Sequence, residues 1–562
     1  MDVGRNPEKI NKLEMPKTGK LISTFAGEVS GILKNTDSLF YRRDSKEIIE
    51  IGKLKIPNSE EYEYTGFISM EPSRFITVLE KYVTPGVYAE VKNKVDGTSK
   101  TEFKERSITA ELSKTILSSD ILQTSLPQIN RIFTIPIPIM DKKGDLTFPK
   151  KGYDERFGSW LPTDAPDISD PNMPLEEAKQ ILKDTFKEFC FQSKQDYTNA
   201  ISALLTPYLR GLFLSFNTRA PVFFYLGNRQ RCGKDYLAGI TGIVYEGYAL
   251  EESPICNSEK NGGGNSDELR KKILSAFIHG RKRMHFSNNK GFIDNAVFEA
   301  ITTSEKHSDR ILGRSEILTF DNELDFSLSG NIGVGFTPDF ANRCRFVRLF
   351  LDIENANLRE FKNPLLHVWV KENRSKIISA LYSLVRNWKE KGSPKGKVPF
   401  ASFNQWASVC GGIMEAAGYD SPCVPDEGIV SVAGDTETIE MKKLFEECYL
   451  RYKDVDIKKV EIQNCISGAE LFPWLDFSKN DDKVKFGILL TRFEGRILSD
   501  IRLEVSKPND RASRKEYKFT KRKQEKSIFD FDDTKSLEPS TAEIITPEII
   551  VQKEDSIQEK LA

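Results

Sequence analysis

Short apolar runs in the middle of the chain predict the buried strands of one parallel sheet. They are 221–227 ("PVFFYLG"), 282–288 ("KRMHFSN"), 324–331 ("LDFSLSGN") and 343–352 ("RCRFVRLFLD"). Nearly continuous apolar runs are typical of strands covered on both faces, and helical patterns separate these runs. The hydrophobic pattern therefore predicts an α/β core over residues 166–375, with a helical lead-in over 175–216.

Upstream of this core the pattern predicts an α+β domain over residues 1–165. Residues 38–56 alternate and turn like a β-hairpin, and 71–83 are typical of a helix. Residues 131–160 are rich in strand-forming positions around a Lys143–Gly144–Asp145 turn. The stretch 161–174, rich in Pro and Asp, is interpreted as a linker.

Downstream of the core we expect a helical connector over 376–434 and a small domain over 435–526. In the small domain, a helix over 485–498 precedes two strand-like runs joined by "SKPNDRAS". The tail, 527–562, has nine acidic and three basic residues and little periodicity. Such a segment is expected to be disordered.

Composition changes this picture little. The chain has 562 residues, with 82 Lys plus Arg against 83 Asp plus Glu, so total charge indicates no partner. We see no run long enough to span a bilayer and no secretory signal, which predicts a cytoplasmic protein without a membrane partner. The eight cysteines form no C-x-x-C pair, so neither a zinc module nor a disulfide framework is indicated.

The candidate chemistry begins at the loop "LGNRQRCGKDYL", residues 226–237. A buried strand, a glycine-containing turn and a helix provide the context of a phosphate-binding loop, and Lys234 supplies a cation for the phosphates. Five residues separate Gly227 from Gly233, where the motif has four. Asn228 repairs the spacing if it replaces the first glycine, because Asn tolerates left-handed backbone angles. An ordinary strand-to-helix turn is the alternative.

The metal-binding position of this loop is unusual. Asp235 stands where the motif has Ser or Thr, and a carboxylate can hold Mg²⁺ directly or through water. The next strand ends in Ser287 and Asn288 without a carboxylate. The predicted cofactors are ATP and Mg²⁺, with Asp235 and Ser287 as metal positions. The predicted nucleotide-binding residues are Gly227, Asn228, Cys232, Gly233, Lys234, Asp235 and Tyr236.

Two residues further along complete the candidate catalytic set. Asn331, at the tip of the third strand, can orient an attacking water molecule, although a simple turn residue explains it equally well. Arg343 can stabilise transition-state charge on a nucleotide held by a neighbouring subunit. The order of loop, strand end, Asn and Arg carries more weight than any one of these signals.

Residues 150–425 resemble the ATPase core of helicase-like replication proteins of phages, plasmids and other mobile elements. These are AAA+-type proteins related to superfamily 3 and minichromosome-maintenance helicases. The resemblance lies in "KKGYDERFG", "GKDYLAG", "SDELRKKILSAFIHGRKRMHFSNNKGFIDNAVFEAITTSEKHSDRILGRSEI", "SLSGN", "PDFANRCRFVRL" and "ASFNQWASVCGGIMEAAGY". The family pattern has Asp at the position of Ser287 and Ser or Thr at that of Asp235.

The resemblance implies a P-loop (AAA+-like) fold, Lys234 on phosphate, Asn331 as sensor and Arg343 as an intersubunit finger. It also implies that Gly313–Arg314 form a hairpin tip that faces DNA in a ring channel; a solvated turn is the alternative.

The C-terminal domain gives an independent indication of nucleic-acid binding. Residues 501–526 contain ten basic and four acidic residues around a loop between two strands. Helices followed by such a basic two-stranded wing resemble a winged-helix module, whose wing contacts phosphates. The predicted nucleic-acid contacts are Arg314, Lys507, Arg511, Arg514 and Lys515.

The sequence thus favours an ATP-dependent DNA helicase or replication initiator of a virus or mobile genetic element, working as a homo-oligomeric ring, expected to be a hexamer. The altered metal position keeps a second hypothesis open: a non-hydrolysing nucleotide- and DNA-binding replication scaffold. A small-molecule kinase is a third, and the length and the basic wing argue against it.

Overall fold

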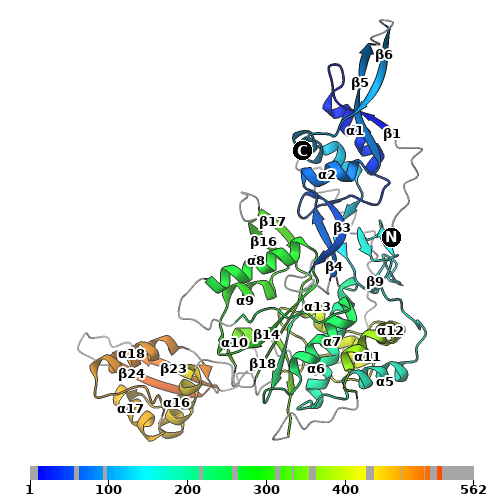
Figure 1. The fold of residues 1–562 in the computed structure, drawn as a ribbon. Coiled ribbons are helices and arrows are strands. Elements are labelled where there is room, and N and C mark those ends of the chain that lie inside the picture. The colour runs from blue at the N-terminus through cyan, green and yellow to red at the C-terminus, as the bar shows by residue number, and fades with distance from the viewer. Residues whose placement is uncertain are drawn as a thin grey trace, which may run out of the picture. The chain divides into compact units, whose positions relative to one another are not determined.

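A computed structural model describes the chain over 11–55, 63–92, 98–213, 219–255, 264–310, 317–331, 334–352, 363–425, 436–469, 471–495, 497–498, 500–506 and 515–521. The chain divides into two compact units, Met1–Asp435 and Thr436–Ala562. Figure 1 shows a mixed α/β architecture with many helices and a central sheet in the first unit. The predicted α/β class is confirmed.

The N-terminal part of the first unit combines small sheets with helices (Figure 1). Its strands are β1 (Asn11–Glu14), β2 (Phe40–Arg42), β3 (Glu47–Lys55), β4 (Glu63–Ser69), β5 (Val83–Lys92), β6 (Ser99–Glu105) and β7 (Gln128–Ile129). Its helices are α1 (Ile22–Leu33), α2 (Pro72–Leu79), α3 (Ala110–Leu117) and α4 (Asp120–Ser125). The strands form two sheets, ordered β1-β5-β6 and β4-β3-β2-β7. The predicted hairpin is β2–β3, and the predicted helix is α2.

A segment of short strands and the first core helices follow. The strands are β8 (Arg131–Ile132), β9 (Ile139–Met140), β10 (Leu146–Thr147), β11 (Gly152–Asp154) and β12 (Ser159–Leu161). The helices are α5 (Leu175–Phe186) and α6 (Lys194–Leu205), with a 3₁₀ segment over Thr206–Gly211. Residues 162–174 have no regular structure, but they are not a free linker. Met173 is buried, and Arg386 donates to the carbonyl of Met173 at 2.7 Å.

The core of the first unit is a four-stranded parallel sheet ordered β14-β18-β13-β20. Its strands are β13 (Val222–Gly227), β14 (Arg283–Asn289), β18 (Asp325–Asn331) and β20 (Cys344–Leu349). All six residues of β13 are buried, as the apolar run predicted. The register pairs Gly227 with Asn331 on one side and with Leu349 on the other, so these three residues share the carboxyl end of the sheet.

Helices cover both faces of this sheet. Side chains of Phe223, Tyr225 and Val347 join one core with α5, α6 and the later helices, and Phe224 and Phe346 join the opposite core. The first cover includes α7 (Lys234–Glu246), α11 (Leu366–Glu372), α12 (Arg374–Glu390), α13 (Asn404–Trp406) and α14 (Gly412–Ala416), with a π-helical turn over Ala407–Gly411. The second cover includes α8 (Gly264–Ile278), α9 (Ala296–Thr303) and α10 (Pro338–Ala341).

Small strand pairs flank the sheet. One is the antiparallel hairpin of β16 (Lys306–Arg310) and β17 (Ile317–Asp321), and the other pairs β15 (Phe292–Ile293) with β19 (Gly335–Phe336).

The second unit packs three helices with one antiparallel sheet. The helices are α16 (Thr436–Tyr452), α17 (Lys459–Gly468) and α18 (Asn480–Phe493). The strands are β21 (Ile457–Lys458), β22 (Ile497–Leu498), β23 (Ile501–Ser506) and β24 (Glu516–Lys521), in the order β21-β24-β23-β22. The helix predicted over 485–498 was misplaced. It ends at Phe493, because Gly495 turns with a left-handed φ of 77° and Ile497–Leu498 pair with β23.

Candidate functional site

The loop between β13 and α7 is a tight turn whose end packs against its start. Gly233 and Arg231 adopt left-handed φ angles of 93° and 61°. A Cβ atom on Gly227 would lie 2.1 Å from the Cys232 sulfur, so only glycine fits there. Burial raises the pKa of the Cys232 thiol, which makes it a neutral packing group. Gly227, Cys232 and Gly233 therefore set the course of the loop.

Asn228 has a different role from the one predicted. Its φ angle is not among the left-handed ones, so it does not act as a glycine substitute. Instead its side chain accepts from the Leu351 N–H at 2.9 Å and donates to the Leu351 carbonyl at 3.1 Å. This pair of hydrogen bonds to the chain just beyond β20 fixes the start of the loop. The left-handed conformation falls on Arg231, which sequence reasoning did not single out.

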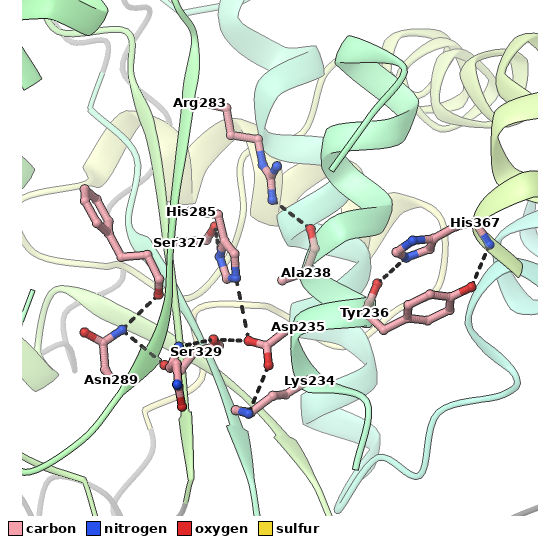
Figure 2. Close-up of polar contacts among 12 residues, drawn as sticks. Lys234, Asp235, Tyr236, Ala238, Arg283, His285, Asn289, Ser327, Ser329 and His367 are labelled. Carbon is pink, nitrogen blue, oxygen red and sulfur yellow. Dashed lines mark hydrogen bonds and ion pairs between the residues drawn. The ribbon is translucent and has the colours of Figure 1, made fainter. Parts of the chain in front are cut away.

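The first two residues of α7 form the centre of the candidate site. Lys234 is buried, and its Nζ donates to Asp235 Oδ2 at 3.0 Å. The other oxygen of Asp235 accepts a hydrogen bond from Ser329 Oγ and lies 3.9 Å from His285 Nε2. Figure 2 shows these side chains converging from α7, β18 and β14. Gly233, at the N-cap, has no side chain to cap the first N–H groups of α7, and such groups favour anions.

The surroundings keep Asp235 ionised, and Lys234 balances its charge. Burial alone would raise the pKa of Asp235, but polar contacts with His285 and Ser329 and the charge of Lys234 outweigh it and lower the pKa. At 3.9 Å the His285 contact is too long for a hydrogen bond, so we count it as electrostatic. Burial lowers the pKa of His285 in spite of Asp235, so the imidazole is neutral at pH 7. Asp235 is thus an anion beside one ammonium group.

Sequence reasoning missed the polar residues of β14 and β18 that face Asp235. His285 Nδ1 lies 2.9 Å from Ser327 Oγ, and these two residues are opposite each other in the register of β14 and β18. Ser329 and Asn331 follow Ser327 at two-residue steps and so lie on the same face of β18. The signal was present in "FSLSGN", where polar residues alternate with apolar ones inside a buried strand.

The end of β14 differs from the predicted metal position. The Ser287 N–H donates to the Glu252 carbonyl at 3.1 Å, and within the described residues its hydroxyl makes no hydrogen bond to Asp235. Asn288 has a left-handed φ of 58°. Asn289 is buried, and its amide donates to the carbonyls of Phe286 and Ser329. Two of these three polar residues thus have a part in shaping the strand end.

Asn331 has a vacant acceptor. The register places it beside Gly227, where the loop starts, and its side-chain oxygen is buried without a hydrogen-bond partner among the described residues. Buried polar atoms are normally bonded, so this oxygen is available to accept from a water molecule or a ligand. Asn331 therefore fits the position predicted for it, and its role stays a prediction.

Arg343 lies at the opposite end of the sheet. It directly precedes β20, and because Gly227 pairs with Leu349, it lies roughly 20 Å from the loop of its own chain at about 3.3 Å per residue. Its guanidinium contacts the Glu299 carbonyl and the exposed carboxylate of Asp339. The structure thus excludes direct contact with Lys234 of the same chain, and a role toward a second copy stays a prediction.

Tyr236 turns away from the loop. Its ring stacks on His367 with centroids 3.4 Å apart, and its carbonyl oxygen lies 2.7 Å from His367 Nε2. These contacts, drawn in Figure 2, connect α7 to the start of α11. The predicted role of Tyr236 in nucleotide binding remains a prediction.

Most predicted nucleic-acid contacts lie outside the described residues. These are Arg314 in the β16–β17 hairpin and Lys507, Arg511 and Arg514 between β23 and β24; the acidic tail lies outside as well. Lys515 is described and exposed. On α18, Val484 and Ile488 are exposed apolar residues. The basic wing therefore stays a prediction.

Within the described ranges, no group of three or more His, Cys, Asp or Glu side chains could hold a metal ion. No helix of the described residues is long and apolar enough to cross a membrane.

Comparison with known proteins adds little. No protein-family model matches the sequence, and no curated protein matches it. An apo structure of the NrS-1 C terminal region overlaps 68% of this chain and 81% of that chain, at 12% identity and a TM-score of 0.32. A second NrS-1 C terminal region structure, residues 305–718, overlaps 70% and 84%, at 12% identity and a TM-score of 0.28. At such TM-scores the likeness supports no argument about fold or function.

Proposed function

We propose that this chain binds ATP with Mg²⁺ at the β13–α7 loop and uses it as a ring-forming DNA helicase or replication initiator of a virus or mobile element. The observation that carries the proposal is the pairing of Lys234 with an uncapped helix N-terminus directly after a buried parallel strand. Ligands of open α/β sheets bind at the carboxyl ends of the strands, where this loop lies. The amide groups and Lys234 together suit a polyphosphate.

In this proposal each side chain has a defined task. Lys234 leaves Asp235 and donates to the terminal phosphates. Asp235, ionised because its pKa is lowered, takes the metal position, and Ser329 keeps its carboxylate in place. Mg²⁺, when bound, neutralises phosphate charge. Asn331 orients the attacking water through its side-chain oxygen, which has no hydrogen-bond partner among the described residues, and Arg343 acts on the nucleotide of a second copy.

The geometry also supports an explanation for why β14 lacks the carboxylate that the family pattern has there. Asp235 lies against His285 of β14 and Ser329 of β18, so its carboxylate already faces the end of the neighbouring strands. A carboxylate carried by α7 thus replaces one carried by β14. The metal ligand and the group that polarises water are then the same residue.

The alternative is a non-hydrolysing replication scaffold with a nucleotide-binding loop. The observation that favours it is at β14, where the Asn289 amide is bonded into the fold and offers nothing to a water molecule. In this hypothesis Asp235 only balances the charge of Lys234.

Binding and hydrolysis measurements on wild type and Lys234→Ala separate these proposals. Hydrogen bonds to charged groups contribute about 1.5–3 kcal/mol, so the substitution should weaken ATP binding about 10- to 100-fold or more. Mg²⁺-dependent phosphate release, measured with and without single-stranded DNA, should be lost in the variant. Unchanged ATP affinity in a folded variant would refute the phosphate-loop proposal. ATP binding by wild type with phosphate release no faster than the variant would favour the scaffold.

A further inference from the structure

The cavity beside the start of β20 has an unusual lining. Its volume is about 320 Å³, and it lies between the start of β20 and residues 399–425. The side chains that matter are Arg343, Arg345, Phe400, Ser402, Asn342 and Cys423. None of them belongs to the β13–α7 loop.

Within the described part of the chain, Arg345 is a buried cation without an anion. It is 7% exposed, and its Nε is buried without a hydrogen-bond acceptor. Among the described residues it has no hydrogen bond and no ion pair; its guanidinium carbon lies 3.5 Å from the centre of the Phe400 ring. Buried charges in proteins are normally paired and hydrogen-bonded, and a cation–π contact satisfies none of the five N–H donors of arginine.

The groups around Arg345 do not neutralise it. Burial raises the pKa of the Cys423 thiol to about 11, even though Arg345 lowers it, so this thiol stays neutral. Burial lowers the pKa of Arg345 to about 10, so the guanidinium remains protonated at neutral pH. Asp339, the one carboxylate among the lining residues, pairs with Arg343. One positive charge is left without compensation.

We propose that this pocket binds a phosphate-bearing anion, with Arg345 as its main ligand. Arg343 also lines the pocket and can serve as a second cation only by leaving Asp339. The planar fork of a guanidinium matches the oxygens of phosphate, which can accept several N–H donors at once. The hydroxyl of Ser402 and the amide of Asn342 line the same space and can serve further oxygens. A cavity this size exceeds the needs of a single carboxylate.

Within one chain this site is separate from the proposed ATP site, and only the assignment of a second copy's nucleotide as the phosphate source rests on the proposed function. The register pairs Phe223 with Arg345 and Gly227 with Leu349, so Arg345 lies roughly 13 Å along the strands from the loop, at about 3.3 Å per residue. The phosphate has two conceivable sources: a small phosphate compound in solution, or the nucleotide held by the loop of a second copy. Both sources would present phosphate oxygens to the guanidinium of Arg345.

Pyrophosphate is the probe, titrated by calorimetry into the full chain carrying Lys234→Ala, so that the β13–α7 loop does not contribute. Binding should occur in this background and should weaken at least ten-fold on adding Arg345→Met, which preserves side-chain length without the charge. The matched control is Arg348→Met on the same strand, because Arg348 lies 3.6 Å from the Asp196 carboxylate. This control should retain pyrophosphate binding.

Absence of pyrophosphate binding in the Lys234→Ala chain overturns the proposal, as does equal affinity with and without Arg345→Met. If Arg345→Met fails to fold, Arg345→Lys replaces it and should bind several-fold more weakly, because an ammonium lacks the fork. Sedimentation of the chain with intact Lys234 then identifies the source. ATP-dependent self-association that Arg345→Met removes assigns the site to a second copy's nucleotide, and unaffected association assigns it to a free phosphate compound.

Discussion

Two cation–carboxylate clusters lie at opposite ends of the same parallel sheet. At the carboxyl end, Asp235 pairs with Lys234; at the amino end, Glu323 pairs with Arg131 at 2.5 Å and Lys282 at 2.8 Å. Both carboxyl groups have a lowered pKa, in the case of Glu323 about 2, although burial alone would raise it. They differ in access, because the Asp235 side chain is 32% exposed and that of Glu323 is 7% exposed.

The difference teaches that a shifted pKa does not by itself identify a functional carboxylate. Perturbed values cluster at active sites, but buried ion-pair networks produce the same shift. Glu323 receives cations from β8 and from the residue before β14, so the fold itself satisfies it. Asp235 lies in the first turn of α7, next to a loop, where a ligand can replace its partner. Three predictions test this distinction.

The largest effect is expected at the closed cluster. Glu323→Gln keeps the shape of the side chain but leaves Arg131 and Lys282 without their counter-charge. Breaking a buried pair in this way typically costs about 3–5 kcal/mol of unfolding free energy. Asp235→Asn should cost about 1 kcal/mol or less, because the Asp235 side chain is partly exposed and water can screen the charge that remains on Lys234. Urea titrations followed by tryptophan fluorescence at pH 7 measure both.

Acid titration of the wild type tests the contribution of Glu323 through the direction in which stability changes with pH. A carboxylate with a lowered pKa stabilises the folded state above its unfolded pKa, and this stability is lost as pH falls through the folded value. The contribution of Glu323 should therefore disappear between about pH 4.3 and about pH 2. Equal destabilisation by Glu323→Gln and Asp235→Asn would contradict the distinction between a closed and an open cluster.

The second effect concerns hydrolysis at the open cluster. If Asp235 is the metal ligand, Asp235→Thr alone should reduce Mg²⁺-dependent phosphate release at least about ten-fold. Adding Ser287→Asp moves a carboxylate back to β14 and should restore or raise turnover. Ser287→Asp alone is the control for a general effect of added negative charge. Failure of the double variant to exceed Asp235→Thr would show that a carboxylate on β14 cannot replace the one on α7.

The sequence predicted the elements of this site better than their connections. The apolar runs located β13, β14, β18 and β20, because strands covered on both faces need continuous apolar side chains. The helix after Gly233 followed from the same pattern. The hydrophobic pattern depends on neighbouring positions in the chain, so it can be recognised without knowledge of the fold.

The contacts that define the two sheet ends are long-range and left little trace in the sequence. Asn228 is bonded to Leu351, 123 positions away. Arg345 contacts Phe400, which only the packing of the later helices brings to β20. The left-handed turn fell on Arg231 because the loop must bring Cys232 back against Gly227. Such demands arise from tertiary structure and override residue preference.

The smallest effect is a pH dependence centred on His285. This imidazole is 2% exposed and faces Ser327, Asp235, Arg283 and Glu251. Burial lowers its pKa and Arg283 adds to the shift, while Asp235 and Glu251 oppose it. The unfolded chain takes up a proton near pH 6.5, and the folded chain does so only at lower pH. Folded-state stability should therefore fall as pH drops below 6.5, by about 1 kcal/mol or less near pH 5.5. His285→Gln should flatten this decline.

The same histidine reports directly on the open cluster. Asp235 holds the His285 pKa up, so Asp235→Asn should lower it further, and Mg²⁺ with ATP should do the same if the metal takes over the carboxylate charge. The chain has four histidines, so an NMR titration of imidazole protons is tractable, with His285→Gln assigning the resonance. Glu323→Gln serves as the comparison, because a cluster closed to ligands should leave the response of His285 to Mg²⁺ and ATP unchanged. A His285 pKa that does not respond to Asp235→Asn would mean that the carboxylate and the imidazole are not coupled across the sheet. The metal role of Asp235 would then lose its electrostatic support.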